Sequence, residues 1–323
     1  MKGENREKQP PFLLIIHGEL HEKQSFYNVL ENRYHTTCIP ILCNKRVLGS
    51  SYGWLVLVDR FTYDCCLWNP ISSSIIELPI LDRAHLYNRC VLSKPPTEPD
   101  CHILFNSSST LEQSFCKIGD DEFGHHSLKQ EKYDLKAIAS FQNKIYGIIE
   151  DDECDYKVVT INLVGNSSLE LKRMFVDDEG QPWIGPQPSP NWVTWKQSCL
   201  IESPCGGELL LVTKMYSGNY LNRFRVFRVD TDGNEIMELE DIGKQTIFIS
   251  HWGTGFCCSS SGRIKSNSIY YTDEEISRDI YIYSLDDGHK TSFTPSPVVG
   301  RYVPLTYWVE HGVLDQLINN TFE

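Results

Sequence analysis

Two histidines four residues apart are the first pair in the sequence that could do chemistry. On a helix, His17 and His21 would share one face, where their ring nitrogens could bind a metal ion. However, a zinc-binding H-E-x-x-H helix has its glutamate directly after the first histidine, and here Gly18 stands there and Glu19 follows. The preceding run at residues 12–16 is apolar and strand-like. We therefore interpret this segment as a strand followed by a turn and predict no metal site.

Acidic residues cluster in three further places. The segment that begins at Asp230 resembles a calcium loop, but it lacks the glycine at the sixth position and the glutamate at the twelfth. Its Asp-Gly step is instead typical of a β-hairpin. Two acid-rich runs, at residues 150–155 and 177–179, could supply paired carboxylates, yet acid–base work needs carboxyl groups from separate segments that face one cleft. Adjacent acids repel one another, so we predict solvated turns, of which Asp151 and Asp152 could dock a basic partner.

Other catalytic signatures are incomplete. The serines at residues 259–261 lack the G-x-S-x-G pattern of a nucleophile elbow. Gly253 and Gly255 lack the third glycine and the preceding β–α unit of a dinucleotide site. We therefore predict no catalytic residue, no cofactor and no enzyme, but a protein that acts by binding a partner.

The overall charge and the cysteines restrict the partners and the compartment. The net charge of −13 over 323 residues repels phosphate backbones and anionic lipids, so neither nucleic acid nor a membrane is an expected partner. No apolar run approaches the roughly 20 residues that cross a bilayer, and the first residues do not form a signal peptide. We therefore expect a cytoplasmic or nuclear protein. In those compartments the 12 cysteines are most simply small buried side chains.

Short strands separated by turns are the elements that must position any site. Runs rich in β-branched, aliphatic or aromatic residues predict strands at residues 54–59, 65–70, 75–79, 144–149, 157–163, 208–213, 224–229, 268–272 and 279–285. Pro70 and Pro79 end two of them, because proline cannot donate to a central ladder. Helical periodicity is nearly absent, and the best helical candidates are residues 25–30 and 313–319.

Regular short strands over most of the chain favour a large sandwich, a barrel or a radial repeat such as a propeller. At roughly 40–50 residues per four-stranded blade, the chain would hold about six or seven blades. A propeller accommodates many similar hairpins without long crossovers and leaves only short edges exposed. We therefore predict an all-β fold, namely a β-propeller of about six or seven four-stranded blades with a short C-terminal tail.

A proline-rich segment at residues 181–191 interrupts this pattern, and Trp183, Trp192 and Trp195 lie in or just after it. One interpretation is a loop between two blades. The other is an aromatic docking surface, because exposed tryptophan is enriched in binding hot spots. Binding residues concentrate on loops that a rigid scaffold holds. The predicted partner contacts are therefore these three tryptophans together with Asp151 and Asp152.

Three stretches also carry a family resemblance. The first is LGSSYGWLVLVD at residues 48–59, followed by LWNP at 67–70 and ELP at 77–79. The second is LEDIGKQTIFIS at residues 239–250, and the third is KSNSIYYTD at 265–273 with DIYIYSLDDG at 279–288. In this order they resemble the plant F-box-associated β-propeller family, the kelch-like propellers of the KIB type.

The resemblance implies a propeller over residues 12–311 that recognises proteins, between a polar N-terminal tail at 1–11 and a C-terminal tail at 312–323. In many members an F-box recruits a Skp1-type adaptor of a cullin ubiquitin ligase, and the propeller presents the substrate. No F-box-like L-P-x-[DE]-[LI] stretch precedes Phe12. Ligase recruitment therefore stays open: the chain could be a fragment, a relative without an F-box, or a protein that binds targets without delivering them. The residues do not identify the target.

The alternative is a propeller that binds or processes a small ligand or a glycan with carboxylates at its central channel. It requires two or more acidic side chains from different blades, about 5–9 Å apart in one deep pocket. A channel lined by Cys, Tyr, Ser and apolar residues would favour the protein-interaction hypothesis.

Overall fold

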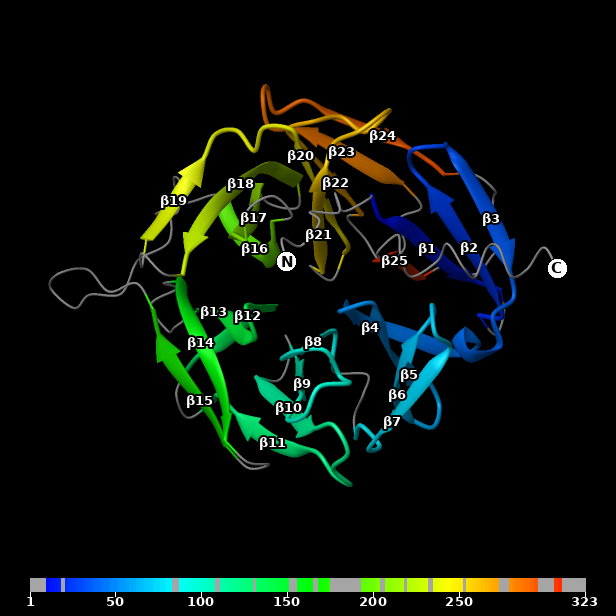
Figure 1. Cartoon of the computed structure of the whole chain (residues 1–323). Helices are drawn as coiled ribbons and strands as arrows, with labels where there is room; N and C mark the ends of the chain where they lie inside the picture. Colours follow the sequence, from blue (N-terminus) through cyan, green and yellow to red (C-terminus); the bar gives the residue numbers. More distant parts are fainter. Residues whose placement is uncertain are drawn as a thin grey trace, which may run out of the picture.

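The computed structural model shows six β-sheets arranged as blades around one central axis (Figure 1). It describes residues 10–18, 21–82, 87–107, 111–129, 132–150, 156–164, 168–174, 193–203, 207–217, 220–231, 235–251, 254–272, 279–295 and 305–309. The prediction of a β-propeller is confirmed, and the blade number is the lower of the two expected values.

In each blade the strands follow one another from an innermost strand at the axis to an outermost strand at the rim. From the inside outward, blade 1 consists of β25 (Leu305–Val309), β1 (Phe12–His17), β2 (Lys23–Asn28) and β3 (Arg33–Thr37). Blade 2 consists of β4 (Lys45–Ser51), β5 (Trp54–Asp59), β6 (Cys65–Asn69) and β7 (Ser74–Leu78). Blade 3 consists of β8 (Arg89–Leu92), β9 (His102–Asn106), β10 (Glu112–Lys117) and β11 (Gly124–Ser127).

The second half of the ring continues in the same way. Blade 4 consists of β12 (Asp134–Phe141), β13 (Lys144–Glu150), β14 (Tyr156–Val164) and β15 (Ser168–Arg173). Blade 5 consists of β16 (Val193–Glu202), β17 (Leu209–Ser217), β18 (Tyr220–Asp230) and β19 (Glu235–Leu239). Blade 6 consists of β21 (Gly255–Ser259), β20 (Gln245–Ile249), β22 (Ser268–Tyr271), β23 (Ile280–Ser284) and β24 (Lys290–Phe293).

Blade 6 departs from the predicted four strands. β20 lies between the innermost strand β21 and β22, and it runs parallel to β22. The other strand pairs of this blade are antiparallel. The hairpin of β20 and β21 therefore adds one strand to the sheet without changing the direction of the innermost strand.

The ring closes by pairing strands from the two ends of the described chain. β25, drawn red in Figure 1, lies beside the blue β1. The two are antiparallel, with Phe12 opposite Val309 and Ile16 opposite Leu305. Blade 1 therefore takes its innermost strand from the C-terminal part of the chain and its other three strands from the N-terminal part.

The hydrophobic core is divided into six clusters, one between each pair of neighbouring blades. Because a blade packs on both of its faces, its middle strands are buried almost continuously instead of alternating. In β17 every residue from Leu209 to Met215 is buried, and in β5 every residue from Trp54 to Val58. This explains why runs such as WLVLV read as strands without a polar face.

One helical prediction was wrong. Residues 25–28 belong to β2, where Phe26 pairs with Leu14 of β1 and with His35 of β3. Tertiary pairing within blade 1 overrides the weak local helical preference. Residues 313–319, the other helical candidate, lie outside the described residues. The described part of the chain contains one helical turn, η1 (Pro40–Leu42), and no helix there could span a membrane.

Candidate functional site

The partner contacts predicted from the sequence lie outside the described side chains. Asp151, Asp152, Trp183 and Trp192 are not among the described residues. The backbone of Trp195 lies in β16 opposite Met215, but its side chain is not described. The structure therefore does not test whether these five residues form one surface.

The strand ends that flank these residues nevertheless share one side of the ring. We call face A the side at which the innermost strands begin, and face B the side at which they end. In a blade of antiparallel strands, the second strand ends on face A and the third strand begins there. The fourth strand also ends on face A, and the innermost strand of the next blade begins there. Glu150 and Tyr156 therefore lie at face A, and so do Arg173 and Val193.

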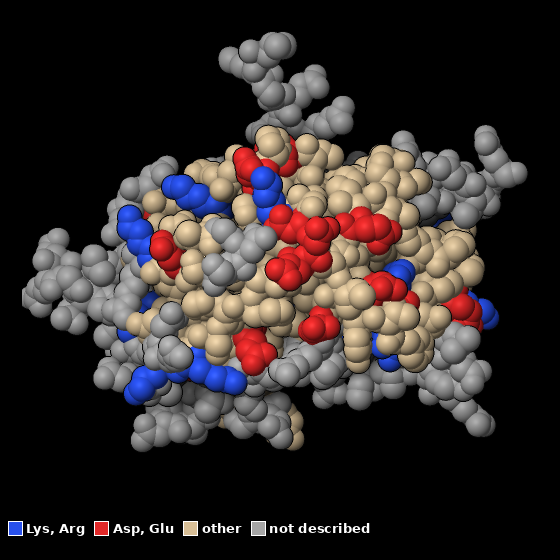
Figure 2. Space-filling model, turned by 90° about the horizontal axis from the view of Figure 1, so that it is seen from below, with Lys and Arg blue, Asp and Glu red and all other residues tan. Residues whose placement is uncertain are grey.

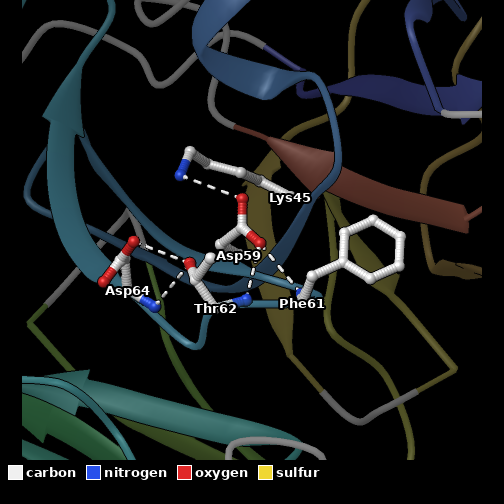
Figure 3. Close-up of polar contacts among 5 residues, drawn as sticks. All are labelled: Lys45, Asp59, Phe61, Thr62 and Asp64. Atoms are coloured by element: carbon white, nitrogen blue, oxygen red, sulfur yellow. Dashed lines mark hydrogen bonds and ion pairs between the residues drawn. The ribbon is translucent and has the colours of Figure 1, made fainter.

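The turn at residues 60–64 lies on this same face and joins β5 to β6. The Asp59 carboxylate accepts hydrogen bonds from the backbone N–H groups of Phe61 at 2.9 Å and Thr62 at 3.0 Å (Figure 3). The Thr62 hydroxyl donates to the Asp64 carboxylate at 2.6 Å. The backbone N–H of Asp59 donates to the carbonyl of Asp64 at 2.9 Å, which closes the turn. The turn is thus held by side-chain and backbone bonds of its own.

Electrostatics keep the Asp59 carboxylate charged. Burial on its own would raise the pKa of Asp59, but the hydrogen bonds from Thr62 and Phe61 together with Lys45 outweigh it and lower that pKa. The Lys45 ammonium lies 3.8 Å from the second carboxylate oxygen. The N–H of Arg60 also donates to the carbonyl of Asn44 at 3.0 Å, so the turn is fastened to the loop before β4.

This fixed turn presents an apolar side chain to solvent. Phe61 is 71% exposed, and Figure 3 shows its ring pointing away from the bonded Asp59, Thr62 and Asp64. Ile80, on the segment after β7, is 61% exposed. The N–H of Leu81 donates to the carbonyl of Tyr63 at 3.3 Å, so the two segments are neighbours on face A. We call Phe61 and Ile80 the blade 2 apolar pair.

The same turn chemistry occurs on the opposite face of this blade. Asn69 accepts hydrogen bonds from the N–H groups of Ile71 at 2.9 Å and Ser72 at 3.0 Å, where β6 leads into β7. Tyr63 and Ser73 take equivalent positions with positive φ angles of 63° and 56°. Ile71 is 44% exposed on face B. It is therefore a matched counterpart of Phe61 for mutational comparison.

Two buried histidines lie at the end of β1 and just after it, and the second of them, His21, contacts the turn at residues 60–64. The Arg60 guanidinium contacts the imidazole of His21, and the His17 ring bonds the Ser25 hydroxyl at 2.8 Å. Burial is the main cause that lowers the pKa of both imidazoles below the ordinary 6.5, with Arg60 adding to the effect at His21 and Lys23 at His17. Glu22 acts in the opposite direction at both.

These two shifts predict a loss of stability in mild acid. The unfolded chain takes up protons at these imidazoles below about pH 6.5, whereas the folded chain resists protonation, so the free energy of unfolding falls as pH drops below about 6.5. Urea unfolding at several pH values measures this slope. In the His17→Gln/His21→Gln double variant the slope should become shallower, and an unchanged slope would show that other groups cause it.

A small cavity lies at the central axis. The space in it that admits a water molecule is about 10 Å³, and it is lined by Val47, Leu48, Gly49, Ser50, Asn88, Thr254, Phe256, Tyr307 and Trp308. These described lining residues are apolar or uncharged, and none is a carboxylate. The paired acids that the glycan-processing alternative requires are therefore not supplied by this cavity. Within the described ranges, no group of three or more His, Cys, Asp or Glu residues is placed to hold a metal ion.

Comparison with known proteins decides the family. Residues 26–284, which include most of the blades and the turn at residues 60–64, match the family described as the KIB1-4 β-propeller. The chain belongs to the KIB1-4 β-propeller family. The resemblance read from its three sequence stretches is thereby confirmed. In this KIB1-4 propeller the matched range begins within β2 and ends with β23, so both members of the blade 2 apolar pair lie inside it.

Individual relatives are more distant. Over 96 residues the KIB1-4 propeller is 33% identical to the F-box protein At4g00893 of Arabidopsis thaliana, a stretch that covers 29% of this chain and 24% of that protein. Among solved structures, TolB from Acinetobacter baumannii has a TM-score of 0.47 at 12% identity, covering 93% of this chain and 67% of the other. A chain of a nidogen/laminin complex has a TM-score of 0.42 at 12% identity, covering 88% and 94%.

Sequence reasoning missed the blade 2 apolar pair in this KIB1-4 propeller. A signal for Phe61 was present, because Asp59 ends a predicted strand and Asp is a residue that bonds the backbone two positions later in a turn. No comparable local signal marks Ile80. Its proximity to the turn at residues 60–64 follows from the packing of one blade, which the chain order does not reveal.

Proposed function

We propose that this propeller is a non-enzymatic protein-recognition module and that face A of blade 2 contacts its target. The observation that carries the proposal is the exposed Phe61 on a turn fixed by its own hydrogen bonds. An aromatic side chain on a preorganised loop loses little conformational entropy on binding, so it is suited to anchor a partner. The strand ends that flank the predicted tryptophan-rich and acidic segments lie on the same face.

Charge supports a protein as the partner in place of a nucleic acid. The net charge of the chain is −13. On the side of the ring seen in Figure 2, acidic side chains gather near the middle of the view, and basic ones lie mostly toward its left. A phosphate backbone would be repelled from such a surface, whereas a protein with basic residues would be attracted.

The similarity to an F-box protein supports a finer proposal. In that proposal the target is a substrate of a ubiquitin ligase, which a Skp1-type adaptor links to the propeller. The similarity covers 24% of that F-box protein, so the adaptor is tested as a separate partner.

Replacing Phe61 by alanine should weaken capture of the target. The tagged chain and its Phe61→Ala and Ile71→Ala variants are incubated with plant cell extract, and the proteins that co-purify are quantified by mass spectrometry. We expect the target to be recovered equally by the unmodified chain and Ile71→Ala, and at least about tenfold less by Phe61→Ala, as is typical of a buried interface anchor.

The controls separate the parts of the proposal. Circular dichroism should be the same for the three proteins, because both substituted side chains are exposed. Equal recovery by Phe61→Ala would exclude blade 2 as the contact surface. Recovery of a Skp1-type adaptor would support the ligase role. Recovery of a specific target without that adaptor would support a module that binds its target but does not deliver it to a ligase. Absence of any protein partner would favour the small-ligand or glycan alternative.

A further inference from the structure

Two of the described cysteines lie on one loop of face A, whereas Cys90, which is also half-buried, lies in β8. Seven of the ten described cysteines are buried, including the adjacent pairs Cys65–Cys66 and Cys257–Cys258. Cys38 is exposed and Cys43 is half-buried. Both lie on the loop between β3 and β4, so they sit at the same face as the blade 2 apolar pair.

The loop brings these two thiols together. The chain between them forms η1, in which the N–H of Leu42 donates to Ile39 at 2.9 Å and the N–H of Cys43 to Pro40 at 3.1 Å. Ile39 and Leu42 are buried and anchor the loop to the core. The backbone thus turns back between the two cysteines, and the Cys43 sulfur lies 3.7 Å from the carbonyl oxygen of Ile39, the residue that follows Cys38.

We propose that Cys38 and Cys43 are an oxidation site that forms a reversible disulfide with a low-molecular-weight disulfide such as oxidised glutathione as the oxidant. The exposed Cys38 thiol loses its proton to water, and its thiolate attacks the glutathione disulfide. One glutathione thiolate leaves and takes up a proton. The Cys43 thiolate then attacks the Cys38 sulfur of the mixed disulfide, and the second glutathione leaves in the same way. Overall, two protein thiols are oxidised and one glutathione disulfide is reduced to two thiols.

The four cysteines of the adjacent pairs are shielded from the oxidant, because each is buried in the packing between two blades. Burial is the main cause that raises the pKa of Cys66 to about 11, and it raises that of Cys65 well above the ordinary range. Thiolate is the reacting form, and these sulfurs are enclosed in the packing between blades. Burial also raises the pKa of Cys43 and so lowers its thiolate fraction, but its attack is intramolecular, on a sulfur of the same short loop.

The position of the loop gives oxidation a route to the recognition surface. Asn44 follows Cys43 directly, and its carbonyl accepts the N–H of Arg60 in the turn that carries Phe61. A disulfide at Cys38 and Cys43 would therefore restrain a loop bonded to that turn. Any effect on partner capture rests on the proposed function, whereas the disulfide itself is measured without a partner.

The test is mass spectrometry of the full chain after incubation with oxidised glutathione. After oxidation the chain is unfolded in urea with iodoacetamide present, so that every free thiol is blocked, including the buried ones. The sample is then digested, and the mass of the peptide that contains both cysteines is measured. We expect this peptide to lack two hydrogens and to regain them with dithiothreitol, while peptides with the two adjacent cysteine pairs carry only the blocking group. In Cys43→Ser, glutathione should remain on Cys38, because no second thiol releases it.

Cys38→Ser is the matched control, in which Cys43 should stay free because it is half-buried and has lost its exposed partner. Two results in the unmodified, folded chain would overturn the proposal. One is that both thiols remain free, and the other is that glutathione accumulates on Cys38 without the internal disulfide. Circular dichroism before and after oxidation confirms that the ring is intact in each measurement.

Discussion

Replacing Trp308 by alanine is expected to lower the free energy of unfolding by roughly 3–5 kcal/mol. Trp308 belongs to β25, the strand that closes the ring, and it is 2% exposed. Its indole N–H donates to the carbonyl of Ile249 at 3.2 Å, and its ring lies 5.0 Å from that of Phe248 in an edge-on arrangement. The truncation would therefore remove packing between blades 6 and 1 and leave the carbonyl of Ile249 without its indole donor.

Urea unfolding followed by circular dichroism measures this loss. Trp308→Phe should fall between the two proteins, because it keeps an aromatic ring but removes the N–H donor. Tyr220→Ala is the control at a side chain that is 83% exposed, and it should change the free energy of unfolding by less than about 0.5 kcal/mol. A Trp308→Ala protein as stable as this control would show that β25 does not hold the ring closed.

Replacing Gln24 by methionine should destabilise the fold by roughly 2–5 kcal/mol, although the two side chains have a similar shape. The Gln24 amide is fully buried and is bonded at both ends. Its oxygen accepts the N–H of Ile39 at 2.7 Å, and its nitrogen donates to the carbonyl of His21 at 3.2 Å. Methionine can make neither bond. The backbone N–H of Ile39 and the carbonyl of His21 would each lose this partner, which lowers the free energy of unfolding by about 1–3 kcal/mol per group.

The neighbouring Lys23→Met is the matched control for this prediction. Lys23 is the adjacent residue of β2 and is exposed, so the same new side chain should change stability by less than about 0.5 kcal/mol there. Hydrogen exchange should also speed up at the Ile39 amide in Gln24→Met. If both substitutions had equally small effects, the Gln24 amide would contribute no net stability to the loop between β3 and β4.

Local patterns were sufficient to predict nine of the 25 described strands. The strand predicted at residues 54–59 is β5 with the same bounds, and the one at 65–70 corresponds to β6, which ends one residue earlier, at Asn69. These segments are bounded by charged residues, Asx turns or proline, which act within a few residues. The blade number could be predicted only to within one. The extra strand β20 lies between strands that follow it in sequence, and local patterns do not contain such an order.

The candidate site was less accessible to sequence reasoning. The tryptophans and the acidic run were predicted as partner contacts from their residue types alone. Of these residues, Asp151, Asp152, Trp183 and Trp192 lie outside the described part of the chain. Phe61 and Ile80 stand in ordinary positions, and only the folded blade reveals that both are exposed on one face. The position of Cys43 beside the backbone that follows Cys38 also depends on the turn through η1. Exposure and proximity are properties of packing, which a single sequence does not report.

The pairing of β25 with β1 makes folding depend on the order of synthesis. The ribosome produces β1 early, but its inner partner is among the last described segments to be made. Until then β1 has an unpaired edge, and open strand edges are templates for pairing with other chains. The nascent chain therefore carries this edge through most of its translation. A stop codon before Leu305 would leave the ring open at blade 1, and we expect such a product to aggregate and not to persist as a five-bladed remnant.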